Sequence, residues 1–249
     1  MPYEFISGRH AVLSVLTNPR RVPSKLFIQN DLPASPVLSE INSQAKTRNV
    51  EIKQVSRFTL EKKFSQSGRS HQGVVLISSP FPYYQLDYLL AKAAKQTVKS
   101  LILDHIHDPH NLGALCRTAE IAGFDAVIIP KDRACEVTPT VAKTSAGASE
   151  IIPIIKVTNL NQTIDKLKEA FITVIGLETG GDKNIYQLNL TGSVALVVGN
   201  EGKGIAQLTQ KKCDTLTEIP MHGQTASLNA SVAGAIAMFE VVRQGMGKK

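Results

Sequence analysis

Strand-like and helix-like segments alternate along the chain from residue 98 onward. Runs rich in Val and Ile, such as SLILD at 100–104, AVIIP at 126–130 and SVALVVG at 193–199, are each followed by a segment with helical spacing. Apolar runs without polar alternation are typical of strands that are buried on both faces of a parallel sheet. The pattern therefore predicts an α/β domain in which helices cover both faces of a mostly parallel sheet.

A smaller α/β layer is predicted for the N-terminal part of the chain. Its expected helices are 10–16, 35–48 and 58–64, and its expected strands are 25–29, 50–55 and 73–78. The segment SSPFPYY at 78–84 interrupts this pattern with two prolines and is the best linker candidate. We therefore divide the chain into an N-terminal domain (1–79), a linker with a lead-in helix (80–97) and a larger domain (98–249).

The positive charge is concentrated in the N-terminal part. The chain has 28 Lys and Arg against 21 Asp and Glu, a net charge of +7. Residues 1–80 hold 11 of the basic and 5 of the acidic residues, whereas residues 81–249 are nearly neutral at +1. An excess of this sign fits a polyanionic partner, and it predicts that the N-terminal part provides the contact.

Other features exclude several classes of protein. Charge, Pro or Gly breaks every long apolar stretch within about ten residues, which argues against a membrane span. The N-terminus, MPYEFISGRH, lacks the pattern of a secretory signal. The three cysteines are never at CxxC spacing, which argues against a disulfide framework and a zinc finger. We expect a cytoplasmic protein.

Three loops after predicted strands carry polar residues and glycines, and ligands of α/β sheets bind beyond the carboxyl ends of the strands. In the first, DHIHDPHNLGALCRT (104–118), we expect Asn111 to cap the helix that carries Arg117. The guanidinium of Arg117 suits a phosphate, with a structural ion pair as the alternative. The H-x-H-D-x-H spacing departs from that of metal hydrolases, and only His222 remains downstream, so no metal site is predicted.

The second loop, VVGNEGKGI (197–205), matches neither GxGxxG nor a Walker A motif. Its backbone N–H groups suit a small polar ligand, and Glu201 disfavours phosphate there; an ordinary glycine-rich turn is the alternative. In the third, IPMHGQTASLNASVA (219–233), we expect Ser227 to cap the last helix and Asn229 to lie in its first turn. The apolar stripe of that helix indicates either core packing or close subunit packing; its residues are Leu228, Val232, Ala235, Phe239 and Val242.

Two basic and polar clusters in the N-terminal domain are candidates for contact with RNA. Arg and His side chains can hold phosphates or stack on bases, and the neighbouring glycines allow close approach. A solvated loop is the alternative. The candidate residues are Arg9, His10, Arg69, His71 and Gln72.

Taken in order, the three loops resemble the three sequence motifs of the SpoU (TrmH-like) family of RNA 2′-O-methyltransferases. The segments GRHAV and HQGV resemble that family's substrate-binding domain, so the resemblance extends from Tyr3 to Gln244. It implies a SPOUT α/β catalytic domain with a C-terminal trefoil knot and a smaller N-terminal domain of the L30e/L7Ae type that binds RNA. It also implies a homodimer formed through the catalytic domain, with the final helix at the interface.

The resemblance further implies the cofactor S-adenosyl-L-methionine (AdoMet), held without any metal. The implied cofactor-binding residues are Gly199, Ile219 and Leu228, with their neighbours Val198, Asn200, Gly202, Pro220 and Met221. The implied catalytic residues are Asn111, Arg117, Glu201, Ser227 and Asn229. Since a free arginine keeps its proton above pH 12, we assign Arg117 to clamping a phosphate and polarising the 2′-hydroxyl.

The leading hypothesis is AdoMet-dependent 2′-O-methylation of a guanosine in the peptidyl-transferase region of 23S rRNA. Two alternatives stay open. One is methylation of tRNA or of another rRNA site by the same chemistry. The other is a non-catalytic RNA-binding factor of ribosome assembly, although such a protein need not keep all five polar residue types of the implied site.

Overall fold

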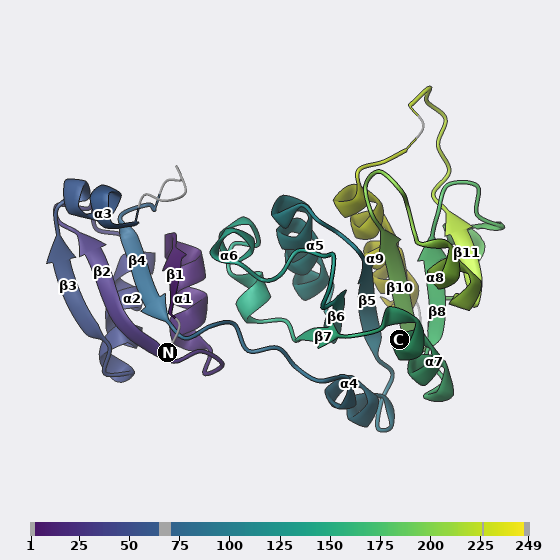
Figure 1. Cartoon of the computed structure of the whole chain (residues 1–249), viewed down its shortest axis with the longest axis horizontal. Helices are drawn as coiled ribbons and strands as arrows, with labels where there is room; N and C mark the ends of the chain where they lie inside the picture. Colours follow the sequence, from purple (N-terminus) through teal and green to yellow (C-terminus); the bar gives the residue numbers. More distant parts are fainter. Residues whose placement is uncertain (1–2, 65–70, 226, 247–249) are drawn as a thin grey trace. The chain divides into compact units, whose positions relative to one another are not determined.

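The computed structural model describes residues 3–64, 71–225 and 227–246 (Figure 1). Its contacts divide the chain into two compact units. Unit 1 comprises Met1–Pro82 and Val137–Ile151, and unit 2 comprises Tyr83–Glu136 and Ile152–Lys249. The segment 137–151, which connects two strands of unit 2, therefore packs with the N-terminal residues. The division into domains at 1–79 and 98–249 stays a prediction.

Unit 1 is a four-stranded mixed sheet with helices on both faces. The strand order is β1-β4-β2-β3, with β4 antiparallel to β1 and β2, and β2 parallel to β3. Its elements are β1 (Glu4–Ser7), α1 (Arg9–Thr17), β2 (Pro23–Gln29), α2 (Pro36–Thr47), β3 (Glu51–Val55), α3 (Arg57–Phe64), β4 (Val74–Ser78), α6 (Pro139–Thr144) and the 3-10 helix η1 (Ala148–Glu150).

The two faces of this sheet are covered to different extents. A large apolar core lies between one face and the helices α1 and α2, where Ile6, Leu26 and Leu76 are fully buried. Among the described residues, the opposite face packs against α3 through a small cluster of Phe27, Leu60 and Val75. Side chains of a β-strand alternate between the two faces, so every strand also contributes residues to this second face. The α3 cluster is small, and part of the second face is exposed to solvent, for example at Phe5.

Unit 2 is built on a seven-stranded sheet of order β7-β6-β5-β10-β8-β11-β9, in which every neighbouring pair is parallel. The strands are β5 (Lys99–Asp104), β6 (Ala126–Pro130), β7 (Ile154–Val157), β8 (Thr173–Leu177), β9 (Lys183–Asn184), β10 (Val194–Gly199) and β11 (Thr215–Glu218). The helices are α4 (Leu86–Ala93), α5 (Pro109–Ile121), α7 (Leu160–Glu169), the 3-10 helix η2 (Ile185–Gln187), α8 (Gln207–Lys212) and α9 (Ala230–Met246).

Helices cover both faces of this sheet, which explains why its central strands are apolar throughout. Ala195 and Val197 of β10 face a core shared with α4 and α7. Val198, which points to the other face, lies close to Gly234 of α9, and α9 packs directly on α5. The predicted class, a mostly parallel α/β sheet in the larger part of the chain and a smaller α/β layer in the N-terminal part, is confirmed. The short strands β1 and β9 were not predicted.

Candidate functional site

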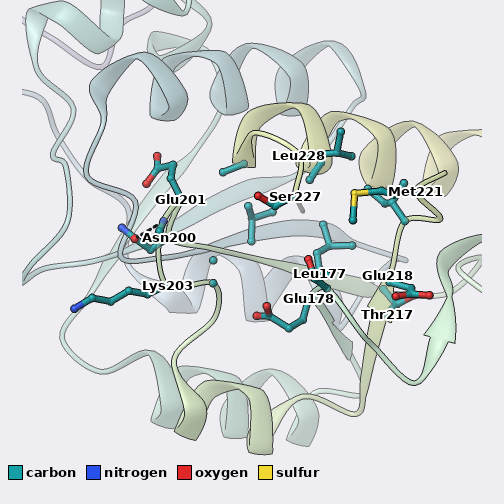
Figure 2. Close-up of a pocket in the computed structure, with 18 residues that line it drawn as sticks. Leu177, Glu178, Asn200, Glu201, Lys203, Thr217, Glu218, Met221, Ser227 and Leu228 are labelled. Carbon is teal, nitrogen blue, oxygen red and sulfur yellow. Dashed lines mark hydrogen bonds between the residues drawn. The ribbon is translucent and has the colours of Figure 1, made fainter. Parts of the chain in front are cut away.

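A pocket of about 350 Å³ lies at the carboxyl ends of β8, β10 and β11 (Figure 2). It is formed by three loops that follow these strands and by the start of α9. The lining residues are Leu177, Glu178, Thr179, Val198, Gly199, Asn200, Glu201, Gly202, Lys203, Gly204, Thr217, Glu218, Ile219, Met221, Ser227, Leu228, Ala230 and Ala233. This position agrees with the general rule that ligands of parallel sheets bind beyond the carboxyl ends of the strands.

The loop after β10 is a tight turn that needs glycine at its base. Asn200 and Gly204 exchange two backbone hydrogen bonds of 2.9 Å. A Cβ on Gly199 would lie 2.2 Å from the carbonyl carbon of Gly204, so any side chain there would collide with the backbone. A Cβ on Gly202 would meet no atom closer than 3.7 Å. The close approach of the two chain segments therefore depends on Gly199.

The end of β5 is tied to the same loop. The buried carboxylate of Asp104 accepts a hydrogen bond of 2.7 Å from the backbone N–H of Ala206. The amide of Asn200 donates a hydrogen bond of 2.9 Å to the carbonyl of His105, whose φ is +60°. The Nδ1 atom of His105 lies 2.5 Å from Asp104 Oδ1. These contacts hold His105 beside the pocket and indicate a structural role for it.

Three polar residues from separate elements meet beside the pocket. The Nδ2 atom of Asn111, on α5, donates a hydrogen bond of 2.5 Å to Glu201 Oε1. The Nδ2 atom of Asn229 donates one of 3.1 Å to Asn111 Oδ1. Glu201 lines the pocket, and Asn111 is buried behind it. The structure thus joins three of the five predicted catalytic residues in one hydrogen-bonded chain.

Both predicted helix caps at this site are wrong. The N-cap of α5 is Asp108, whose side chain accepts from the N–H of His110, and Pro109 fills the first helical position. Asn111 lies inside the helix, where its side chain is free to bind Glu201. At the start of α9, Asn229 Oδ1 accepts from the N–H of Ser231, while Ser227 lines the pocket.

Arg117 does not reach this pocket within the chain. It is exposed on α5 and is absent from the residues that line the pocket. Within the described part of the chain Arg117 forms no ion pair, which removes the support for the structural alternative. Of the predicted cofactor-binding residues, the structure places all but Pro220 in the pocket lining.

Three charged residues of the pocket, Glu178, Lys203 and Glu218, were not predicted from the sequence and lie there together with the predicted Glu201. Carboxylates of Glu178, Glu201 and Glu218 lie on different sides of it, against the single ammonium of Lys203 (Figure 2). Glu178 Oε2 accepts a hydrogen bond of 2.9 Å from the N–H of Ile205 and so holds the glycine loop. Glu178 directly follows a predicted strand, and this position is the sequence signal that could have identified it as a pocket residue.

The apolar stripe of α9 is not core, so that alternative is wrong. Val232 is 46% exposed and Phe239 is 48% exposed. The buried face of α9 consists of other residues, among them Ala237, Met238 and Val241. The exposed stripe remains available for packing against a second subunit.

In unit 1 the structure brings two predicted RNA-contacting clusters together. The backbone N–H of Arg9 donates to Gln72 Oε1 at 3.0 Å, and Arg9 Nε donates to the Gln72 carbonyl at 3.3 Å. His71 Nδ1 accepts from the N–H of Gly73, and burial lowers the pKa of His71. His10, which follows Arg9 directly in the sequence, is exposed to solvent. Arg69 lies outside the described residues.

The described residues contain no metal site, no reactive thiol and no membrane-spanning helix. No group of three His, Cys, Asp or Glu side chains among those residues could hold a metal ion. Burial raises the pKa of Cys116 and Cys213 to about 12 and that of Cys135 to about 11, so all three remain protonated thiols. None of the described helices is long and apolar enough to cross a membrane.

Comparison with known families gives two matches that together span most of the chain. Residues 99–239 match the model of the SpoU rRNA Methylase family. Residues 5–84 match a second model, described as RNA 2′-O ribose methyltransferase substrate binding.

Individual relatives agree with these matches. The 23S rRNA (guanosine-2′-O-)-methyltransferase RlmB of Vibrio vulnificus is 41% identical and is covered over 100% of both chains. A putative TrmH family tRNA/rRNA methyltransferase of Staphylococcus epidermidis is 39% identical over 96% of this chain and 95% of its own length. In fold, the SpoU methyltransferase AviRb from Streptomyces viridochromogenes, solved in complex with AdoMet, has a TM-score of 0.82 at 21% identity, covering 98% of this chain and 91% of its own.

Proposed function

The chain belongs to the SpoU rRNA methylase family, and we propose that it transfers a methyl group from AdoMet to the 2′-oxygen of a guanosine in 23S rRNA. One structural observation carries the chemistry: the hydrogen-bonded chain Asn229–Asn111–Glu201 ends at a pocket fit for the cofactor. The full-length match to a 23S rRNA guanosine methyltransferase supports the choice of substrate over tRNA. A ribosomal RNA substrate implies a cytoplasmic protein.

The residues of the pocket fit AdoMet in both shape and charge. Apolar side chains such as Leu177, Ile219 and Leu228 suit the adenine ring, and backbone groups around Gly199 suit its polar edge. Three carboxylates against one ammonium favour a ligand with a positive sulfonium and ammonium. When bound, AdoMet supplies an electrophilic methyl group.

The polar chain positions a carboxylate for the ribose. Because Asn111 occupies one oxygen of Glu201, the second oxygen is left to accept a hydrogen bond from the 2′-hydroxyl. This contact orients the hydroxyl for in-line attack, and the Glu201 carboxylate takes up the proton that the hydroxyl releases as the methyl group is transferred. Asn229 fixes the orientation of Asn111, since it donates to Asn111 Oδ1 and thereby leaves Nδ2 to face Glu201.

We further propose that the protein acts as a homodimer through α5 and α9. These helices pack on each other, and both have exposed apolar residues, Ile121 on α5 and Phe239 on α9. Arg117 lies one turn before Ile121 on α5. In such a dimer, Arg117 is available to the site of the partner subunit, where its guanidinium would clamp a phosphate of the RNA.

Unit 1 serves in this proposal as the module that captures RNA. The net charge of residues 1–80 favours a polyanion, and the contact between Arg9 and Gln72 brings two basic loops together.

A methyl-transfer assay with purified components tests this function. The protein is incubated with methyl-labelled AdoMet and with 23S rRNA, 16S rRNA or tRNA from a strain without the gene, and the RNA is digested to nucleosides. We expect label in 2′-O-methylguanosine from 23S rRNA alone. Label in tRNA would favour the related activity, and RNA binding without any transfer would favour the non-catalytic assembly factor.

A further inference from the structure

The face of the unit 1 sheet opposite α1 and α2 carries an aromatic residue, Phe5, that α3 covers only in part. The strand register places Phe5, Ile77, Lys25 and Glu51 side by side in one row across β1, β4, β2 and β3. Phe5 belongs to the edge strand β1 and is 49% exposed. Single exposed apolar side chains are common on proteins, so the significance of Phe5 depends on what lies beside it on the same face.

The exposed ring is held in place by an aromatic cluster. Phe64, the last residue of α3, lies between two rings, with its centroid 5.2 Å from that of Phe5 and 5.0 Å from that of Phe27. The ammonium of Lys63 lies 4.9 Å from the Phe27 centroid and 5.8 Å from the Phe64 centroid. Phe5 therefore packs against a ring that has a cation beside it.

Further cations lie on the same face. Lys25 and Lys53 share a single carboxylate, that of Glu51, at 2.8 Å and 3.2 Å. These two lysines hold the pKa of Glu51 below its usual value. Two ammonium groups against one carboxylate give the cluster one excess positive charge at neutral pH. The face thus combines an open aromatic ring with a surplus of positive charge.

The outer side of α3 repeats this combination. Leu60 and Phe64 turn toward the sheet, whereas Phe58 is 71% exposed. Lys62 follows Phe58 by one helical turn and is also exposed.

We propose that the sheet surface formed by Phe5, Lys25, Lys53 and Lys63 binds single-stranded RNA by stacking an unpaired base on the phenyl ring of Phe5, with Phe58 and Lys62 on the outer side of α3 as a second contact. Flat aromatic surfaces beside lysines suit unpaired bases and their phosphates, whereas a duplex keeps its bases out of reach. The proposal rests on the proposed function only in taking RNA as the partner. It names a surface separate from the Arg9 and Gln72 loops.

The absence of tryptophan from the sequence provides a direct test. In the full-length Phe5→Trp variant the only indole lies on the proposed surface, and a base stacked on it quenches its fluorescence. The probe is a 12-nucleotide unpaired RNA carrying a dye, so that anisotropy reports binding independently. We expect quenching that saturates together with anisotropy, and none with the same sequence in a duplex. Tyr186→Trp, which places an exposed indole in unit 2, should show no quenching.

A second variant separates stacking from burial. Phe5→Leu keeps an apolar side chain but removes the ring, and we expect affinity for the unpaired RNA to fall roughly tenfold, a typical stacking effect. Circular dichroism confirms that each variant is folded. Binding that saturates without quenching, together with unchanged affinity in Phe5→Leu, would overturn the proposal. Trp emission that changes with protein concentration alone would instead assign the face to a second copy of the chain.

The outcome is independent of the catalytic proposal. Quenching without methyl transfer would leave this surface as an RNA contact and refute the proposed function. Methyl transfer by a protein whose indole is never quenched would support the proposed function and refute this surface as an RNA contact.

Discussion

The side-chain amide of Asn111 lies 2.5 Å from the carboxylate of Glu201, although 90 residues separate the two in sequence. Asn111 comes from the helix after β5, and Glu201 comes from the loop after β10, a neighbouring strand. Only Glu201 lines the pocket. The pair therefore links a buried positioning residue to a carboxylate that faces the ligand.

Replacing Asn111 should impair chemistry more than cofactor binding. In Asn111→Ala, Glu201 loses its hydrogen-bond donor and its fixed orientation, so we expect the single-turnover rate of methyl transfer to fall by about 10²-fold. The dissociation constant for AdoMet, measured by calorimetry, should change less than about threefold, because Asn111 does not line the pocket. Asn42→Ala removes a partly buried asparagine of unit 1 and serves as the control. A large loss of AdoMet affinity with an unchanged rate would refute this division of roles.

Two glycines of one loop should respond differently to alanine. Gly199→Ala forces a collision with the backbone at Gly204, so we expect a loss of about 1–3 kcal/mol in stability and at least a tenfold loss of AdoMet affinity. Gly202→Ala has space for its methyl group and should retain both properties nearly unchanged. Thermal unfolding with and without AdoMet measures the two effects. Equal tolerance at both positions would contradict the tight turn.

Mixed dimers can show where Arg117 acts. If Arg117 serves the site of the partner subunit, a dimer of one Arg117→Ala and one Asn111→Ala subunit contains one complete site. Random exchange of two inactive variants should then restore about a quarter of the wild-type rate, since half the dimers are mixed and each has one active site. No recovery after subunit exchange, verified by tagged subunits, would place Arg117 in the site of its own chain.

A buried ion pair should hold the segment 137–151 within unit 1. Arg21 donates two hydrogen bonds of 2.9 Å to Glu150, and both side chains are almost fully buried. Arg21→Met leaves the buried carboxylate of Glu150 without its partner and should cost about 3–5 kcal/mol in urea denaturation. Glu150→Leu should cost less, because Arg21 keeps its contact of 2.6 Å with Glu4, and the double variant should cost less than Arg21→Met alone. The exposed pair Arg57 and Glu61 is the control, and its removal should cost less than about 1 kcal/mol. Additive losses from the two buried substitutions would contradict this coupling.

Most of the fold follows from the sequence because its strands are long and apolar and its helices have clear periodicity. The strand β9 has two residues, too few to show a pattern, and in β1 only Phe5 and Ile6 of the four residues are apolar. The packing of 137–151 with unit 1 depends on a contact between residues 129 positions apart, which no local pattern contains. The sequence motifs located the pocket loops, but the capping roles of Asp108 and Asn229 were missed because neighbouring polar residues compete for each helix end.

The exposed stripe of α9 shows the same limit. Val232 and Phe239 repeat at helical spacing, as core residues do, yet the buried side of α9 is filled by Ala237, Met238 and Val241. When apolar residues surround most of a helix, the sequence does not show which side is buried within the subunit and which side is exposed.

Mapping ribose methylation in 23S rRNA tests the central claim most directly. Ribosomal RNA from cells with the gene, without it, and with the Glu201→Gln variant is compared by resistance of the 2′-O-methylated position to alkaline cleavage. The account predicts one guanosine that is methylated only in the presence of the wild-type gene and that purified protein with AdoMet methylates in RNA from the deletion strain. An identical pattern of methylated riboses in 23S rRNA from all three strains would contradict it.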